Sequence, residues 1–143
     1  VVGFLSRKDK DLIIQAIIEA EKKTSGEIRV HVENKAEKDP FLRAEEVFYE
    51  LGMHKTQQRN GVLFYLAVKE RKFTILGDEG INNKVPDDFW EGIKNVMTEE
   101  FSRESFVSGL TKGIALAGEA LAQYFPYQHD DVNELANEVS GDF

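Results

Sequence analysis

Polar and apolar residues alternate strictly from Glu27 to Glu33, in the order E-I-R-V-H-V-E. Alternation of this kind sends every second side chain to the same face, so it predicts a strand that is buried on one side. The segment from Val62 to Val68 is instead continuously apolar, which predicts a central strand covered on both faces by helices. A third strand is predicted over residues 72–76, and the short polar turn before it requires an antiparallel arrangement.

Four segments carry apolar residues at helical spacing. The first begins at a capping-box-like pair, Ser6 and Asp9, and ends near Lys23. The second begins at Asp39, with a proline at its first helical position, and ends at Gly52. A third helix is predicted to carry four apolar residues: Phe89, Ile93, Val96 and Met97. The fourth is expected to start at Ser102 or Ser105 and to end before Pro126.

The first strand, the second helix and the second strand form a βαβ unit, whose right-handed crossover makes the two strands parallel. Together with the antiparallel third strand and the remaining helices, this order predicts an α/β fold. The architecture is a three-layer α/β/α sandwich with a mixed central sheet. The 143 residues suit one domain. We expect this domain to span residues 1–126, with an acidic extension over residues 127–143 that packs on it or trails from it.

Acidic residues outnumber basic ones by 26 to 18, which gives a formal charge of −8. A field of this sign repels nucleic acids and anionic membranes and attracts cations. Without cysteine, the chain has no disulfide, no thiolate metal ligand and no cysteine nucleophile. Its longest apolar run is much shorter than the roughly 20 residues that span a membrane. We therefore expect a soluble, cytoplasmic monomer with neither a nucleic-acid nor a membrane partner. A protein partner and a signal peptide removed before Val1 both stay open.

Strand direction predicts that acidic residues gather at one edge of the sheet. Parallel strands start at the same edge, and an antiparallel third strand ends there, so residues flanking these three ends should be neighbours. The loop that follows is rich in carboxylates and amides, which are the ligands that hard cations take. We therefore predict a divalent-cation site, with calcium favoured over magnesium, to which a second acidic stretch in the tail folds back. The predicted ligands are Asp78, Glu79, Asp87, Asp88, Asp130, Asp131, Asn133 and Glu134, with Glu27 and Asn60 as secondary candidates.

Each acidic feature also has a simpler explanation. Asp87 and Asp88 would suit the start of the third helix as caps, Asp78 would suit an ordinary turn, and the tail would suit a solvated terminus. The loop does not match an EF-hand, because Asn83 stands where glycine is required. The three histidines are far apart, and His31 is expected to be exposed. The chain would then be a plain protein-interaction domain.

Four segments of the chain resemble the TPM domain family, whose members include a plant thylakoid-lumen protein and an animal receptor accessory protein. The segments span residues 24–30, 59–64, 71–77 and 86–89, and the resemblance covers roughly residues 6–124. It implies an α/β/α sandwich, divalent-cation binding and, from the lumen members, acid phosphatase activity. We expect neither the usual secretion signal nor the transmembrane segment, and the sequence adds an acidic tail; these departures disfavour photosynthetic and membrane-accessory roles.

Two functional hypotheses follow. In the first, a divalent cation orders the loop of residues 77–88 in a regulatory or interaction module. In the second, the protein is a metal-assisted acid phosphatase that acts on phosphate esters. No catalytic residue is evident for the second hypothesis, and Arg59 is the nearest candidate to bind a phosphate.

Overall fold

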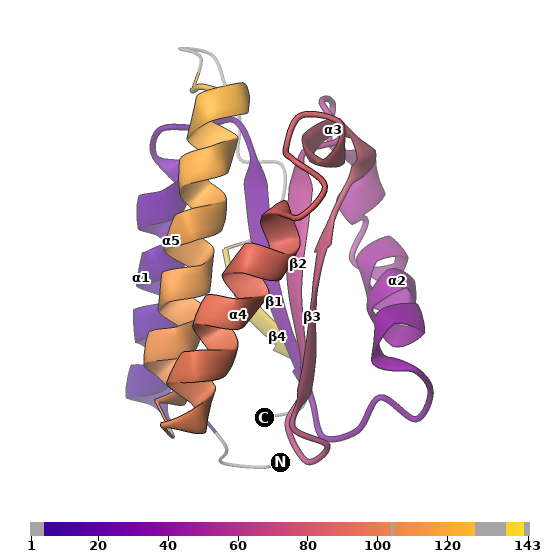
Figure 1. Ribbon diagram of the computed structural model, residues 1–143, viewed down its shortest axis with the longest axis vertical. Coiled ribbons are helices and arrows are strands. Elements are labelled where there is room, and N and C mark those ends of the chain that lie inside the picture. Colours follow the sequence, from indigo (N-terminus) through magenta and orange to yellow (C-terminus); the bar gives the residue numbers. More distant parts are fainter. Residues whose placement is uncertain (1–4, 104, 128–136, 142–143) are drawn as a thin grey trace.

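The computed structural model describes residues 5–103, 105–127 and 137–141 of the chain (Figure 1). Over these residues the strands form one mixed sheet in the order β3-β2-β1-β4. Strands β2 and β4 both run parallel to β1, and β3 runs antiparallel to β2. The strand bounds are β1 Glu27–Glu33, β2 Gly61–Ala67, β3 Lys72–Gly77 and β4 Val139–Gly141.

Helices cover both faces of this sheet, which confirms the predicted α/β sandwich (Figure 1). Helices α1, α4 and α5 lie on one face and α2 lies on the other. A short helix α3 follows β3 directly, and a 3-10 turn η1 follows α2. The helix bounds are α1 Arg7–Glu21, α2 Pro40–Glu50, η1 Met53–Lys55, α3 Glu79–Asn82, α4 Phe89–Ser102 and α5 Phe106–Tyr124.

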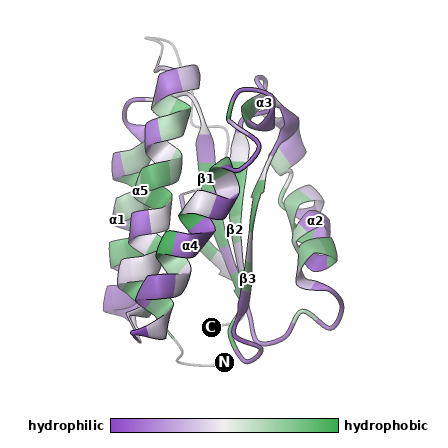
Figure 2. Cartoon of the chain, viewed as in Figure 1, coloured by the Kyte–Doolittle hydropathy of each residue, from purple (hydrophilic) through white to green (hydrophobic). Residues whose placement is uncertain are grey.

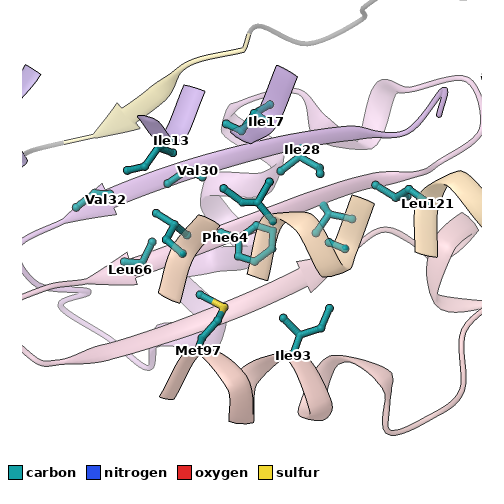
Figure 3. Packing of buried hydrophobic residues seen from close by; sticks show 14 of the residues in the cluster. Ile13, Ile17, Ile28, Val30, Val32, Phe64, Leu66, Ile93, Met97 and Leu121 are labelled. Carbon is teal, nitrogen blue, oxygen red and sulfur yellow. The ribbon is translucent and has the colours of Figure 1, made fainter. Parts of the chain in front are cut away.

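Strand β2 is apolar throughout because it supplies side chains to two separate cores. Phe64 and Leu66 point towards α1, α4 and α5, whereas Leu63 and Tyr65 point towards α2. Figure 3 shows Phe64 packed among residues of the larger core, which include the fully buried Ile13. Burial of such a side chain stabilises a fold by roughly 1.5–3 kcal/mol. The hydropathy colouring shows the same arrangement, with apolar strands between helices that are polar outside (Figure 2).

The predicted helix starts are present. Helix α1 opens with a reciprocal capping box, in which the Asp9 N–H donates to Ser6 Oγ and the Ser6 N–H donates to Asp9 Oδ2, both at 3.0 Å. Helix α2 opens at Asp39, whose carboxylate accepts from the backbone N–H of Phe41 and Leu42. No helix in the described ranges has both the length and the apolar character that membrane crossing requires.

Several features differ from the sequence prediction. The short helix α3 lies within the predicted loop of residues 77–88, and β1 is buried on both faces, since Glu27 and Arg29 are only 2% and 6% exposed. Strand β4, which lies within the predicted acidic extension, was not predicted. The prediction that His31 is exposed was wrong: its side chain is 11% exposed, because β4 lies beside β1 and covers it. Of the four apolar residues predicted on the third helix, Phe89, Ile93 and Met97 pack in the core beneath α4, whereas Val96 is 37% exposed.

Candidate functional site

The end of the sheet at which β1 and β2 begin and β3 finishes brings together residues that are far apart in the sequence. Glu27 at the start of β1 pairs with Gly61 at the start of β2. The Asp78 N–H, directly after β3, donates to the Gly61 carbonyl at 2.9 Å. The Glu27 N–H donates to the Asn60 carbonyl at 3.4 Å. These contacts place Glu27, Asn60, Asp78 and Glu79 along this end of the sheet, which we call the rim.

An arginine occupies the centre of this rim. Asp78 is 6% exposed, and its two carboxylate oxygens accept hydrogen bonds from Arg59 Nε at 2.7 Å and Nη2 at 2.8 Å. The remaining Nη1 of Arg59 donates to Glu79 Oε1 at 3.2 Å. A bidentate pair of this kind is among the strongest ionic contacts in proteins. A guanidinium therefore lies where the sequence predicted a metal ion, and Arg59 is bound to carboxylates rather than exposed to receive a phosphate.

Asp78 also determines the backbone geometry of the loop. Its Oδ1 accepts from the Glu79 N–H at 2.8 Å, so Asp78 caps the short helix α3 and is not the ordinary turn residue of the simpler explanation. Helix α3 lies directly against the loop that precedes β2. An ideal Cβ on Gly80 would lie 2.1 Å from the Gln58 carbonyl oxygen and 2.4 Å from that of Arg59. This close approach sets the separation between Asp78 and Arg59.

The other carboxylates of the loop point into solvent. Asp87 and Asp88 are exposed in the turn before α4, and no ion pair is formed by either within the described ranges. Asp88 occupies the N-cap position of α4, but its side chain makes no capping hydrogen bond. Asn82, in contrast, donates to the Gly77 carbonyl at 2.8 Å and accepts from Trp90 Nε1 at 2.7 Å. The loop is thus anchored at Asn82 and leaves two carboxylates free at its far end.

Within the part of the chain that the structure describes, acidic and histidine side chains alone do not form a metal cage. Across residues 5–103, 105–127 and 137–141, no group of three or more His, Asp or Glu side chains is close enough to hold an ion. The tail candidates Asp130, Asp131, Asn133 and Glu134 lie outside the described residues, and their approach to the loop stays a prediction. The described residues on either side of these candidates are held to the domain. The Tyr127 N–H donates to the Lys23 carbonyl, and Val139 pairs with Val30 in the sheet.

Buried polar groups lie both in the rim and directly behind it. Asn60 is fully buried, and its Oδ1 has no hydrogen-bond partner in the described part of the chain. Glu21, at the end of α1, accepts from the Ile28 N–H at 2.7 Å. Burial raises the pKa of the Glu21 carboxyl to about 8, and the nearby charge of Glu27 adds to this rise. Sequence reasoning missed Glu21 because it lies on a helix end and not in a loop.

Replacement of Glu21 by glutamine is expected to flatten the dependence of stability on pH. The raised pKa means that the stabilising contribution of Glu21 is complete below pH 4.5 and is lost as pH rises through about 8. Relative to Glu21→Gln, the wild-type protein should lose at least about 1.4 kcal/mol between pH 5 and 8, the value of one pKa unit. Urea unfolding across this range measures the difference. Glu119→Gln, on the exposed surface of α5, should retain the wild-type pH dependence; an equal dependence in Glu21→Gln would contradict the prediction.

A second ionic cluster lies on the α2 face of the sheet, centred on Glu33. The Glu33 carboxylate accepts from Arg43 Nε at 2.9 Å and Nη2 at 2.8 Å, and from the Tyr65 hydroxyl at 2.7 Å. Burial alone would raise the pKa of Glu33, but the bonds from Arg43 and Tyr65 outweigh it and lower the pKa to about 2. Glu33 is therefore ionised at any physiological pH.

Polar side chains also connect β4 to β1. His31 Nδ1 lies 2.8 Å from Ser140 Oγ, and Arg29 Nη2 donates to Glu138 Oε1 at 3.1 Å. Burial lowers the pKa of His31, and the Ser140 hydroxyl also donates to the Val30 carbonyl at 3.3 Å. Polar cross-strand pairs therefore supplement the three-residue ladder between these strands.

Comparison with known proteins gives the same fold. The BA42 protein from the psychrophilic bacterium Bizionia argentinensis is 48% identical, with a TM-score of 0.90 over 96% of this chain and 95% of that one. The N-terminal domain of cg2496 from Corynebacterium glutamicum is 17% identical, with a TM-score of 0.66 over 96% of this chain and 80% of that one. An N-terminal domain from P. gingivalis is also 17% identical, with a TM-score of 0.67 over 89% and 84%. At 17% identity these two share the fold alone.

No curated protein matches the chain. The TPM domain, however, matches residues 2–120, which is most of the sequence. The predicted resemblance is thereby confirmed: this chain belongs to the TPM domain family.

Proposed function

We propose that the rim binds a divalent cation, with calcium favoured over magnesium, and that the ion regulates the position of Arg59. The observation that supports the proposal is that Asp78 and Glu79 both bind the same positively charged group. Two consecutive carboxylates whose oxygens converge on one cationic side chain present the hard ligands that calcium takes. The guanidinium of Arg59 thus stands in for the ion.

Charge at this end of the molecule favours such an exchange. Asp78 is nearly buried and needs a positive partner in either state, because an unpaired buried carboxylate is costly. Asp87 and Asp88, exposed in the same loop, add negative charge that attracts a cation. Water and backbone carbonyls supply the remaining ligands of an ion with a coordination number of roughly 6–8.

Exchange of Arg59 for an ion gives the domain two states. Without the ion, Arg59 binds Asp78 and Glu79; with it, the guanidinium is released into solvent, where a protein partner can bind it. The ion selects the second state by its preference for the freed carboxylates. Since the ion must displace Arg59, we expect a dissociation constant on the order of 10⁻⁴ to 10⁻³ M, as in weak extracellular calcium modules.

Calorimetric titration with calcium and with magnesium tests this proposal. Asp78→Asn keeps the oxygen that caps α3 but removes a charge, and it should abolish measurable binding. Arg59→Gln removes the competing cation and should tighten calcium binding about tenfold, which corresponds to about 1.4 kcal/mol. Asp11→Asn, on the exposed surface of α1, makes the same charge change as Asp78→Asn and should bind as the wild type does.

Amide spectra recorded with and without calcium add a second measurement. The proposal expects shifts at Arg59 and over residues 77–88. Unchanged calcium binding in Asp78→Asn, or weaker binding in Arg59→Gln, removes the rim as the site. Phosphate-ester hydrolysis stays a prediction from family resemblance, and no contact in the described residues favours it.

A further inference from the structure

The end of the sheet opposite the rim carries an apolar groove of about 870 Å³. It lies where the chain turns from β2 to β3, between the start of α2 and the junction of α4 with α5 (Figure 1). Its floor is aromatic: Phe73 packs edge-to-face on Phe101 at 5.1 Å between ring centroids, and Phe101 stacks on Phe106 at 5.3 Å. Phe41 at its margin is 48% exposed. The groove therefore offers a ligand aromatic surface bordered by polar side chains.

The charge around the groove is opposite to that of the whole chain. Its basic lining residues are Arg71, Lys72 and Lys94, and its one acidic lining residue is Asp39, which caps α2. Lys94 Nζ lies 5.8 Å from the centre of the Phe73 ring. None of the three basic residues forms an ion pair with a described residue. In a chain of net charge −8, this is a local excess of positive charge that favours an acidic ligand.

The groove also borders an open strand edge. Strand β3 is the outer strand of the sheet next to β2. The bond from the Asp78 N–H to the Gly61 carbonyl sets the alternation of the antiparallel ladder. By this alternation, Thr74 exchanges its backbone bonds with β2, whereas the N–H and C=O of Phe73 and Ile75 point away from it. Outward-pointing groups on an edge strand are a template for one more strand.

We propose that this groove binds an extended segment of another protein, in which apolar residues alternate with acidic ones, as an additional strand beside β3. Main-chain bonds to Phe73 and Ile75 would fix its register, and alternate side chains of a strand point to opposite faces. Its apolar side chains would contact the aromatic floor formed by Phe73 and Phe101. Its acidic side chains would lie beside Lys72 on the α2 side.

A second copy of this chain fits the groove less well than an acidic segment. Two-fold pairing of β3 with itself puts the same surface patch on both sides of the interface. The groove of each copy would then bring its own Arg71, Lys72 and Lys94 to a shared interface, where like charges repel. Charge complementarity therefore selects a partner of the opposite sign.

The test uses a fluorescein-labelled peptide in which glutamate alternates with valine and phenylalanine, titrated with the whole chain and followed by fluorescence anisotropy. Wild-type protein should bind it, and Lys72→Glu should weaken binding at least tenfold. Lys8→Glu, on the exposed surface of α1, makes the same charge change and should bind as the wild type does. A second peptide with lysine in place of every glutamate should not bind, and amide shifts on binding should centre on Phe73 and Ile75.

Three results would overturn the proposal. The first is absence of binding by the glutamate peptide at millimolar concentration. The second is equal loss of affinity in Lys72→Glu and Lys8→Glu, or equal binding of the two peptides, because charge at the groove would then have no part. The third is sedimentation of the free protein as a dimer that the glutamate peptide dissociates, since the groove would then belong to a second copy of the chain.

Discussion

Gly80→Ala is expected to lower the free energy of unfolding by about 3 kcal/mol, the upper part of the range for added volume in a packed site. The new methyl group would meet two backbone carbonyl oxygens, those of Gln58 and Arg59, at 2.1 and 2.4 Å. Backbone atoms cannot rotate aside as the end of a long side chain can. Helix α3 must therefore move away from the loop that carries Arg59, and urea unfolding measures the cost.

Gly92→Ala provides a matched control for this prediction. An alanine Cβ at Gly92, the fourth residue of α4, has no neighbouring atom within 4 Å. Because alanine favours the helix over glycine, this variant should be more stable than the wild type by roughly 0.5–1 kcal/mol. Destabilisation of the two variants by similar amounts would show that the close approach of α3 is not the cause. Only Gly80→Ala should perturb the amide signals of Arg59 and Asp78.

Glu33→Gln is expected to remove a large part of the dependence of stability on acid pH. The pKa of Glu33 is lowered from 4.5 to about 2, and a shift of this size without screening corresponds to about 3 kcal/mol. Solvent next to the carboxylate reduces this figure to about 2 kcal/mol. Because the pKa is lowered in the folded state, this stabilisation is present above pH 4.5 and is lost as pH falls towards 2.

Urea unfolding at a series of pH values between 7 and 2 measures this effect. The wild type should exceed Glu33→Gln in stability by about 2 kcal/mol at pH 7, and the two should converge near pH 2. Glu45→Gln, on the same face of the molecule but without an ion pair to a described residue, should follow the wild type throughout. His31 affects stability at higher pH. Because burial lowers the pKa of His31, the protein loses stability through this residue as pH falls below the ordinary value of 6.5. Parallel curves for the wild type and Glu33→Gln would exclude Glu33 as the acid-sensitive group.

Local patterns in the sequence were sufficient to predict most of the fold. The alternation of β1, the continuous apolar run of β2 and the short turn before β3 predicted all three strands and their directions. Strand β4 could not be predicted in this way, since Val139, Ser140 and Gly141 are too few to show a period. Their strand conformation depends on β1, which supplies the ladder and the side chains of Arg29 and His31.

Strand direction in the sequence also predicted that the rim residues are neighbours. The pairing of Arg59 with Asp78 was missed, although a signal for it was present: Arg59 precedes β2 by two residues and Asp78 directly follows β3, at the same edge. The groove had no comparable signal, because its lining comes from five separate elements that only tertiary packing assembles. The predicted cation, the tail ligands, the monomeric state and the cytoplasmic location stay predictions.

The pairing of β4 with β1 has a consequence for synthesis of the protein in a cell. The contact between His31 and Ser140 joins residues 109 positions apart in the chain. At roughly 5–20 residues per second, a ribosome needs on the order of ten seconds to add this length. During that interval one side of β1 has no neighbouring strand, and an uncovered strand edge pairs readily with other chains. Nascent chains of this domain should therefore depend on chaperones more than the small size of the domain suggests.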